Sequence, residues 1–209
     1  MASSSSSSSS SVILFTPGQH TPLIPYLAAI HASCITHDRT IASFIPPLSH
    51  EKLLAYWKDR IAEVSAGTRL LLLLVRADDN DPATTSNGLL FHHNHNHNPA
   101  VPKGTHVMGI VMLDMPPSET SSFRAVVEKL LIHPSYRARG GATALVDALE
   151  REAVERGRTM LTLAAESGSL AESVFSKLGY TEVGRIPKYG LSPSGEFKDV
   201  TFFYKSLET

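Results

Sequence analysis

The segment from Leu130 to Ala142 constrains the fold more than any other part of the chain. It begins with an apolar run that ends at His133-Pro134, continues through a short basic turn with two glycines, and leads into a helical pattern. A helix that starts at such a turn has N–H groups without internal partners, at the positive end of its dipole. The segment therefore predicts a strand–turn–helix unit with an anion site at the start of the helix.

The turn carries the features that a phosphate site needs. Gly140 and Gly141 have no Cβ, so a ligand can approach the backbone closely. Arg137 and Arg139 add fixed positive charge in a fork geometry that suits phosphate. The pattern is neither a nucleotide P-loop nor Gly-x-Gly-x-x-Gly. We interpret it as a pyrophosphate cradle, the alternative being a glycine turn that only joins a strand to a helix.

Three motifs carry a resemblance to a known family. Arg137-x-x-Gly140-x-Ala142 resembles the Gln/Arg-x-x-Gly-x-Gly/Ala signature of the GNAT superfamily of N-acetyltransferases, and Ala171-Glu172-x-x-Phe175-x-x-Leu178-Gly179-Tyr180 resembles its second signature. The tail from Val183 through Tyr189 and Asp199 to Lys205 is similar to the subgroup that includes the tabtoxin-resistance acetyltransferase. The resemblance implies transfer of an acetyl group from acetyl-CoA to a primary amine, with a small molecule as the acceptor.

The resemblance also implies where coenzyme A binds. The backbone of Leu131 and Ile132 is expected to serve the thioester carbonyl and the pantetheine amides, and Phe175 is expected beside the cofactor. The residues expected to form the cradle itself are Arg137, Ala138, Arg139, Gly140, Gly141, Ala142 and Thr143.

Acetyl transfer requires a base that takes a proton from the amine. The candidates for this base are Glu128, Glu166 and Asp199, although each is also consistent with an ordinary surface carboxylate. For the acceptor pocket the best candidate is Tyr189, and the others are Tyr26, Trp57 and Tyr204.

Two positions depart from the family pattern. Many relatives place a tyrosine where this chain has Phe175, which has no hydroxyl to protonate a thiolate, and Leu163-Ala164-Ala165 stands where relatives often carry Leu-Asp-Thr. These departures support an alternative, a non-catalytic acyl-CoA-binding protein.

The apolar patterns predict an α/β or α+β fold. Strands are expected at 12–15, 70–75, 106–115, 123–132, 160–164, 180–186 and 199–206, and helices at 22–37, 50–65, 141–156 and 169–178, with a loop at 187–196. This order is also that of the GNAT fold, which implies a mixed, largely antiparallel sheet of about seven strands with helices on both faces. In that fold the strands on either side of the cradle splay apart.

Two segments lie outside the expected folded core. Residues 1–11 form a serine-rich tail that we expect to be disordered, and 78–104 read as a mobile loop within a single domain spanning 12–209. The loop contains His92, His93, His95 and His97. Because the tract lacks fixed geometry, we expect no required metal, and a metal-binding protein organised by this tract is the remaining rival.

Composition narrows the class of partner and compartment. The formal net charge of −1 provides no overall field that would attract nucleic acid or membrane. Cys34 is the only cysteine, so no internal disulfide forms, in agreement with a cytoplasmic location. We therefore expect acetyl-CoA and a small amine as partners, and the sequence leaves a homodimer open.

Overall fold

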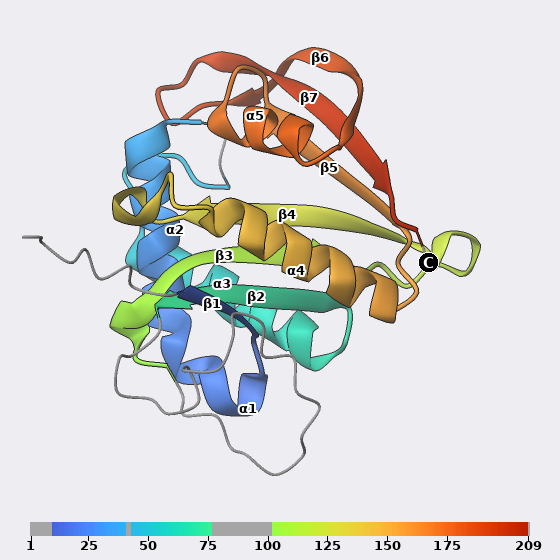
Figure 1. Ribbon diagram of the computed structural model, residues 1–209. Coiled ribbons are helices and arrows are strands. Elements are labelled where there is room, and N and C mark those ends of the chain that lie inside the picture. The colour runs from blue at the N-terminus through green and yellow to red at the C-terminus, as the bar shows by residue number, and fades with distance from the viewer. Residues whose placement is uncertain (1–9, 41–42, 77–101, 209) are drawn as a thin grey trace, which may run out of the picture.

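The computed structural model describes residues 10–40, 43–76 and 102–208. Their centre is a seven-stranded sheet with the strand order β1-β2-β3-β4-β5-β7-β6 (Figure 1). The strands are β1 (Ser10–Leu14), β2 (Arg69–Arg76), β3 (Val107–Asp114), β4 (Arg124–Ile132), β5 (Met160–Glu166), β6 (Thr181–Leu191) and β7 (Phe197–Ser206).

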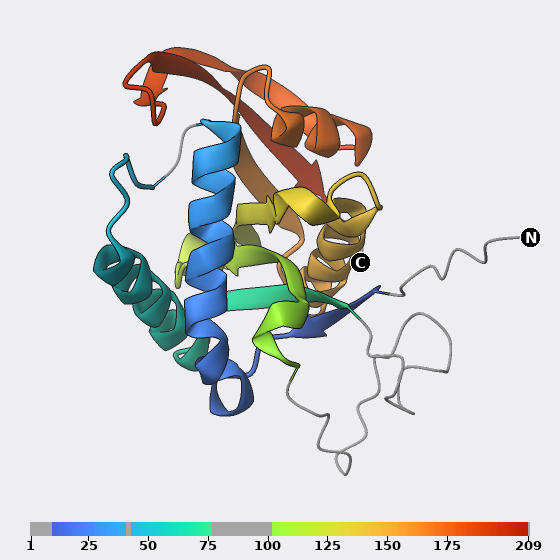
Figure 2. The same cartoon turned by 90° about the vertical axis from the view of Figure 1, so that its left-hand side faces the viewer.

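Helices cover both faces of this sheet, as Figure 2 shows. One face carries α2 (Ile24–Asp38) and α3 (His50–Ser65), with the short α1 (Pro17–His20) before them, and the other face carries α4 (Gly141–Glu155) and α5 (Leu170–Lys177). Ser49 caps α3 by accepting a hydrogen bond from the Lys52 N–H, and Ser169 caps α5 in the same way. The fold class expected from the sequence is confirmed.

The sheet is antiparallel except at its centre. There β4 and β5 run parallel, as the crossover through α4 requires, and they pair only from Arg124 to Val126 and from Met160 to Thr162. Beyond these residues the two strands part, whereas β5 and β7 stay paired along the full length of β5, up to Glu166. The splaying that the family resemblance implied is therefore present.

The two sides of the sheet bury separate apolar clusters. Alternate residues of β2 and β3 face α4 on one side, including Leu72 and Val111, and face α2 and α3 on the other, including Leu71 and Met112. This alternation is the period of two expected of a strand buried on both faces. β2 and β3 are thus buried on both faces of the sheet.

Several element boundaries differ from the sequence prediction, most clearly at the N-terminal end of the described chain. β1 starts at Ser10, which pairs with Arg76, so the last two residues of the predicted tail belong to the sheet. The first predicted helix is preceded by α1 and a 3₁₀ turn over Thr21–Leu23. Residues 1–9 lie outside the described part of the chain.

The predicted loop at 187–196 is wrong in its first half, because β6 continues through Pro187 to Leu191. β6 is an edge strand that pairs only with β7, so a residue without an N–H is tolerated there. The pairing shifts between Ile186 and Gly190, where Lys188 has a φ of 52° and its N–H donates to Asp199 Oδ1 at 2.9 Å.

Within the described residues, no helix combines the length and the apolar character needed to cross a membrane.

Candidate active site

A bulge in β4 lies beside the opening between β4 and β5. Met112 pairs with Glu128 and Ile110 with Leu131, so the single residue Val111 faces both Lys129 and Leu130. Lys129 takes up the extra residue in the left-handed region, with a φ of 52°. β4 therefore changes direction three residues after Val126, where its pairing with β5 ends.

The opening leaves backbone groups without strand partners. Backbone N–H and C=O groups along a strand point alternately to its two neighbours. Past Val126, those that point toward β5 have no strand to pair with, although β4 remains paired with β3 up to Ile132. An extended molecule that contains amides can lie along this side of β4.

The opening leads to the N-terminus of α4, where Gly140 is the capping residue with a φ of 78° and no side chain caps the helix. The first bond of the helix runs from the Ala144 N–H to the Gly140 carbonyl at 3.0 Å, so the N–H groups of Gly141, Ala142 and Thr143 have no intrahelical partner.

The space around the Cα atom differs between the two glycines of this turn. A Cβ on Gly140 would meet nothing within 4 Å, whereas a Cβ on Gly141 would approach Leu74 Cδ2 to 2.5 Å. Open space for a ligand therefore lies at Gly140, and Gly141 is small because α4 packs closely on β2.

Arg137 lies differently from the sequence expectation that its guanidinium faces phosphate. Its Nη1 and Nη2 donate to the two carboxylate oxygens of Asp38, at 2.5 and 2.8 Å, and its Nε donates to the Ile132 carbonyl at 3.0 Å. Burial would raise the pKa of Asp38, but the hydrogen bonds from Arg137 and His37 and the charges of both side chains lower it. Arg137 thus joins the end of α2 to the end of β4 and fixes the start of the turn.

Two neighbours of Arg137 complete this region. The Cys34 thiol is buried and lies 3.4 Å from the Ile132 carbonyl, and burial raises its pKa to about 11, so it is an inert packing residue. Arg139 is exposed, with its guanidinium carbon 5.8 Å from the centre of the Tyr136 ring. Arg139 therefore remains the more accessible of the two arginines in the turn.

The first candidate base, Glu128, is held by a buried arginine. Arg69 is 4% exposed, and its Nη1 donates to Glu128 Oε2 at 2.8 Å. The same guanidinium contacts Glu63 of α3 at 2.5 Å and Asp114 of β3 at 3.0 Å. Glu128 therefore lies on the α2–α3 face, one residue before the bulge.

The other two candidate bases lie across the opening. Glu166 ends β5 and pairs in register with Val200, next to Asp199 on β7. Asp199 Oδ1 accepts the Lys188 N–H, and the Asp199 carbonyl accepts the Ser167 N–H. The structure thus brings Glu166 and Asp199 together on neighbouring strands and places Glu128 on the other side of the opening.

The aromatic candidates occupy three environments. Phe175 is 4% exposed and packs edge-to-face on Tyr180 at 5.2 Å, within the core under α4 and α5. Tyr189 is 55% exposed on β6 and contacts Phe202 at 5.3 Å. Trp57 is fully buried, so its proposed place in an acceptor pocket is wrong.

Sequence reasoning missed three residues that shape this region: Asp38, Arg69 and Lys129. One signal for Arg69 was present, because a lone arginine opens the apolar run Leu70–Val75 and an aspartate closes the following strand. The partners of Asp38 and the bulge at Lys129 depend on long-range contacts that no local pattern encodes.

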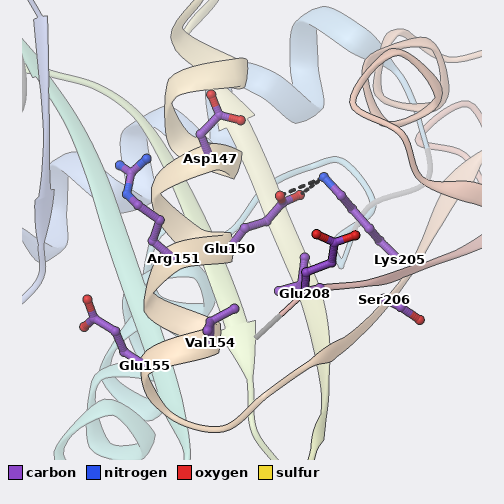
Figure 3. Close-up of a pocket in the computed structure, with 9 residues that line it drawn as sticks. Asp147, Glu150, Arg151, Val154, Glu155, Lys205, Ser206 and Glu208 are labelled. Atoms are coloured by element: carbon purple, nitrogen blue, oxygen red, sulfur yellow. Dashed lines mark hydrogen bonds and ion pairs between the residues drawn. The ribbon is translucent and has the colours of Figure 1, made fainter.

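A separate surface hollow lies along the C-terminal half of α4 and the end of β7 (Figure 3). Four carboxylates and two cations line it, and Glu150 accepts hydrogen bonds from Lys205 Nζ at 2.8 and 2.7 Å. This negative lining is unsuited to a phosphorylated ligand. The opening that ends at Gly140 is therefore the better candidate site.

Among residues 10–40, 43–76 and 102–208 there is no cluster of three or more histidine, cysteine, aspartate or glutamate side chains that could hold an ion. The histidine tract lies at 92–97, outside these ranges.

Comparisons with known proteins identify the family. Solved structures similar to this chain include an N-acetyltransferase from Staphylococcus aureus Mu50 (TM-score 0.65, 13% identity, covering 96% of this chain and 100% of that one). Another, provisionally named a phosphinothricin N-acetyltransferase, has a TM-score of 0.68 at 16% identity and covers 96% and 100%. A third is yncA from Salmonella typhimurium, described with its cofactor acetyl-CoA (TM-score 0.62, 17% identity, 95% and 94%). The sequence model of the Acetyltransferase (GNAT) family matches residues 53–180, so the chain belongs to this family.

Proposed function

We propose that this protein transfers an acetyl group from acetyl-CoA to the primary amine of a small molecule. The observation that carries the proposal is the opening between β4 and β5, which leads to the uncapped start of α4. Membership of the acetyltransferase family and the acetyl-CoA described with the Salmonella relative support it.

The cradle for the pyrophosphate is the backbone of the turn from Arg137 to Thr143. Unpartnered N–H groups at the start of α4 suit an anion, and Gly140 leaves the space for its approach. Arg139 supplies the accessible charge, while Arg137 holds the turn in place through Asp38. The N–H groups of Leu131 and Ile132 point to opposite sides of β4, and the one on the side without a strand partner is proposed to serve the pantetheine arm.

The proposed general base is Glu128, because it lies on β4 between the point where the strands part, after Val126, and the bulge at Lys129. The hydrogen bond from Arg69 Nη1 to Glu128 Oε2 fixes the position of the carboxylate. Glu166 and Asp199 are the alternatives, and Asp199 already accepts an N–H from Lys188. Tyr189 remains a proposed acceptor contact.

Substitution of each carboxylate by its amide distinguishes these bases. We expect Glu128→Gln to lower kcat by about 100-fold, because a general base typically contributes about 100- to 10,000-fold. Glu166→Gln and Asp199→Asn serve as matched controls, and each should change kcat by less than about threefold. A larger loss in either control would move the base to the β5–β7 side.

The departing thiolate is expected to leave without a side-chain acid. Phe175 has no hydroxyl and is packed against Tyr180 in the core. A thiolate is a weak enough base to leave unaided or through water. The same feature favours the second candidate function, an acyl-CoA binder without transferase activity.

The tail on β6 and β7 supports a narrower assignment, to the subgroup that includes the tabtoxin-resistance acetyltransferase. Its motif residues, from Val183 to Tyr189, lie on β6, next to Asp199 of β7. The resemblance to that subgroup implies small amines as acceptors, which agrees with the proposed substrate class.

Calorimetric titration with acetyl-CoA tests the proposal, followed by thiol release over a panel of amines. Saturable binding near one molecule per chain with product formation is the expected result. Binding without product from any amine would favour the non-catalytic alternative. Absence of binding in a folded sample would contradict the proposed pyrophosphate cradle.

A further inference from the structure

The bulge in β4 places two consecutive charged side chains on one face of the sheet. Glu128 contacts Arg69, which contacts Glu63 of α3, and Lys129 lies with its Nζ 5.9 Å from the centre of the Tyr56 ring, also on α3. Successive residues of a regular strand point to opposite faces. The extra residue of the bulge is therefore the reason that Lys129 faces α2 and α3.

Lys129 lies at the edge of a cluster of aromatic rings. Tyr56 contacts Trp57 at 5.5 Å and Phe44 at 5.6 Å, and His31 lies 5.5 Å from Tyr56. The Nδ1 atom of His31 is buried without a hydrogen-bond partner among the described residues. Burial lowers the pKa of Lys129, and burial together with the Lys129 charge lowers the pKa of His31 to about 4.

The carboxylates of this region are already paired with arginines. Arg69 contacts Glu63, Asp114 and Glu128, and Arg60 contacts Glu63 at 2.6 Å. In the part of the chain that the structure describes, no carboxylate lies within ion-pair distance of Lys129. The Glu128 carboxylate acts on Lys129 through its charge without forming an ion pair. A half-buried ammonium without an ion pair is costly, and a carboxylate that reaches it gains a charge-assisted hydrogen bond.

The position of Lys129 relates this cation to the reaction. Pairing of β4 with β5 ends at Val126, and Lys129 is the residue at which β4 bends beside the opening. The cradle belongs to α4 on one face of the sheet, whereas Lys129 belongs to the other face. An acceptor that approaches from the α2–α3 face therefore meets Lys129 beside the proposed base Glu128.

We propose that Lys129 determines acceptor specificity by binding a carboxylate of the acceptor, so that the preferred substrates are amino acids and similar amines that carry an acidic group. This inference rests on the proposed function and adds the chemical class of the acceptor. Lys129 acts as a contact to the part of the acceptor that does not react.

The test compares amino acids with their amides as acceptors. The kcat/KM ratio of acid to amide is measured by thiol release for the wild type, Lys129→Met and Lys129→Arg. Methionine keeps the length of the side chain and adopts the same backbone conformation at the same cost, and arginine keeps the charge. Intrinsic differences between the two amines cancel when this ratio is compared between variants.

We expect Lys129→Met to lower the acid-to-amide ratio by about tenfold or more, as the loss of a hydrogen bond to a charged group does. Lys129→Arg should retain the ratio within about threefold. Arg60→Met is the matched control, because it removes a second cation beside Tyr56 whose charge is already used by Glu63. This control should leave the ratio unchanged.

Other outcomes overturn the inference. An unchanged ratio in Lys129→Met, with or without an equal loss of rate for both acceptors, would show that Lys129 does not contact the acid group, while acetyl transfer itself would stand. Failure of the folded wild type to bind acetyl-CoA would overturn the proposed function, and this inference with it.

A binding measurement decides the question if the correct acceptor is absent from the panel. Trp57 is the only tryptophan of the chain and lies in the same ring cluster. Addition of amino acids to the protein with coenzyme A should change its fluorescence in the wild type and not in Lys129→Met. Equal responses in the two proteins would contradict the inference.

Discussion

The two faces of the sheet are built in different ways. Beneath α4, the described side chains of β2, β3 and β4 that pack against it are apolar, including Leu72, Leu74 and Val111. Beneath α2 and α3, the apolar cluster is interrupted by Arg69 and by the half-buried Lys129. The first face holds the helix whose N-terminus is the proposed cradle, and the second places charged side chains beside the opening, where the proposed reaction would use them.

The largest expected effect comes from removing the buried arginine, Arg69, on the α2–α3 face of the sheet. Arg69→Met leaves Glu63, Asp114 and Glu128 without their common partner, and we expect a loss of about 4 kcal/mol in the free energy of unfolding. Denaturant titration measures this loss. Arg60→Met, which breaks only one partly exposed pair with Glu63, should cost less than about 1 kcal/mol. Equal costs would show that Arg69 does not organise the cluster.

The second prediction concerns the pH dependence that the same face gives to stability. Burial and the charge of Lys129 lower the pKa of His31 in the folded chain to about 4. At a pH between this value and the ordinary pKa of histidine, His31 binds a proton in the unfolded chain and not in the folded chain. The contribution of neutral His31 to stability is therefore fully present when the pH is above the ordinary pKa of histidine, and it is lost as the pH falls toward 4. From about pH 7 to about pH 4 this contribution is about 3 kcal/mol.

Unfolding of His31→Leu at several pH values measures this contribution, because the variant should lose less stability on acidification than the wild type. Ile35→Val is a matched control, since Ile35 is a buried residue of the same helix that does not titrate. It should lower stability by a similar amount at every pH. A pH dependence in His31→Leu that equals that of the wild type would assign the acid sensitivity elsewhere.

The third prediction tests the cradle on the opposite face. Gly140→Asp should weaken acetyl-CoA binding by about 100-fold, or about 2.7 kcal/mol, because it adds negative charge where the pyrophosphate is expected. Gly140→Asn has a similar shape without the charge and should lose less affinity. Gly157→Asp, a left-handed glycine beyond the other end of α4, controls for backbone strain. Arg139→Glu should also weaken binding severely.

The smallest expected effect concerns the junction between the two faces. Asp38→Asn removes the charge that Arg137 binds, and since both side chains are partly exposed, we expect a loss of about 1 kcal/mol in stability. Acetyl-CoA affinity should fall by about threefold, because the turn is held less firmly. Asp59→Asn, at an exposed position of α3, should change neither. A hundredfold loss of affinity would give Arg137 a direct role in binding.

The parts of the fold that the sequence predicted are those set by local patterns. The strand, glycine turn and helix from Leu130 to Glu155 follow from apolar periodicity and from Gly140, and the structure has them in place. Pro187 misled the prediction because a strand's tolerance of proline depends on whether it lies at the edge of a sheet, which is a property of the whole topology.

The roles of individual side chains were harder to predict. Arg137 has the residue type of a phosphate ligand, yet its partner Asp38 lies 99 residues away in the sequence. The bulge at Lys129 is invisible in a run such as Arg124–Ile132, where buried and half-buried positions mix. The candidate bases, the cradle contacts and Tyr189 therefore remain predictions from residue type, now with a defined placement.

The short pairing of β4 with β5 has a consequence for local unfolding. The backbone hydrogen bonds between the two halves of the sheet come from one short stretch at the start of β4 and β5. The helices also divide between the halves, because α4 packs on β1 to β4 and α5 packs on β5. Amide hydrogens of β5 to β7 are thus expected to exchange in a cooperative unit separate from that of β2 and β3. A ligand that lies along β4 and contacts β5 replaces the missing ladder, and its binding would slow exchange on both sides of the opening at once.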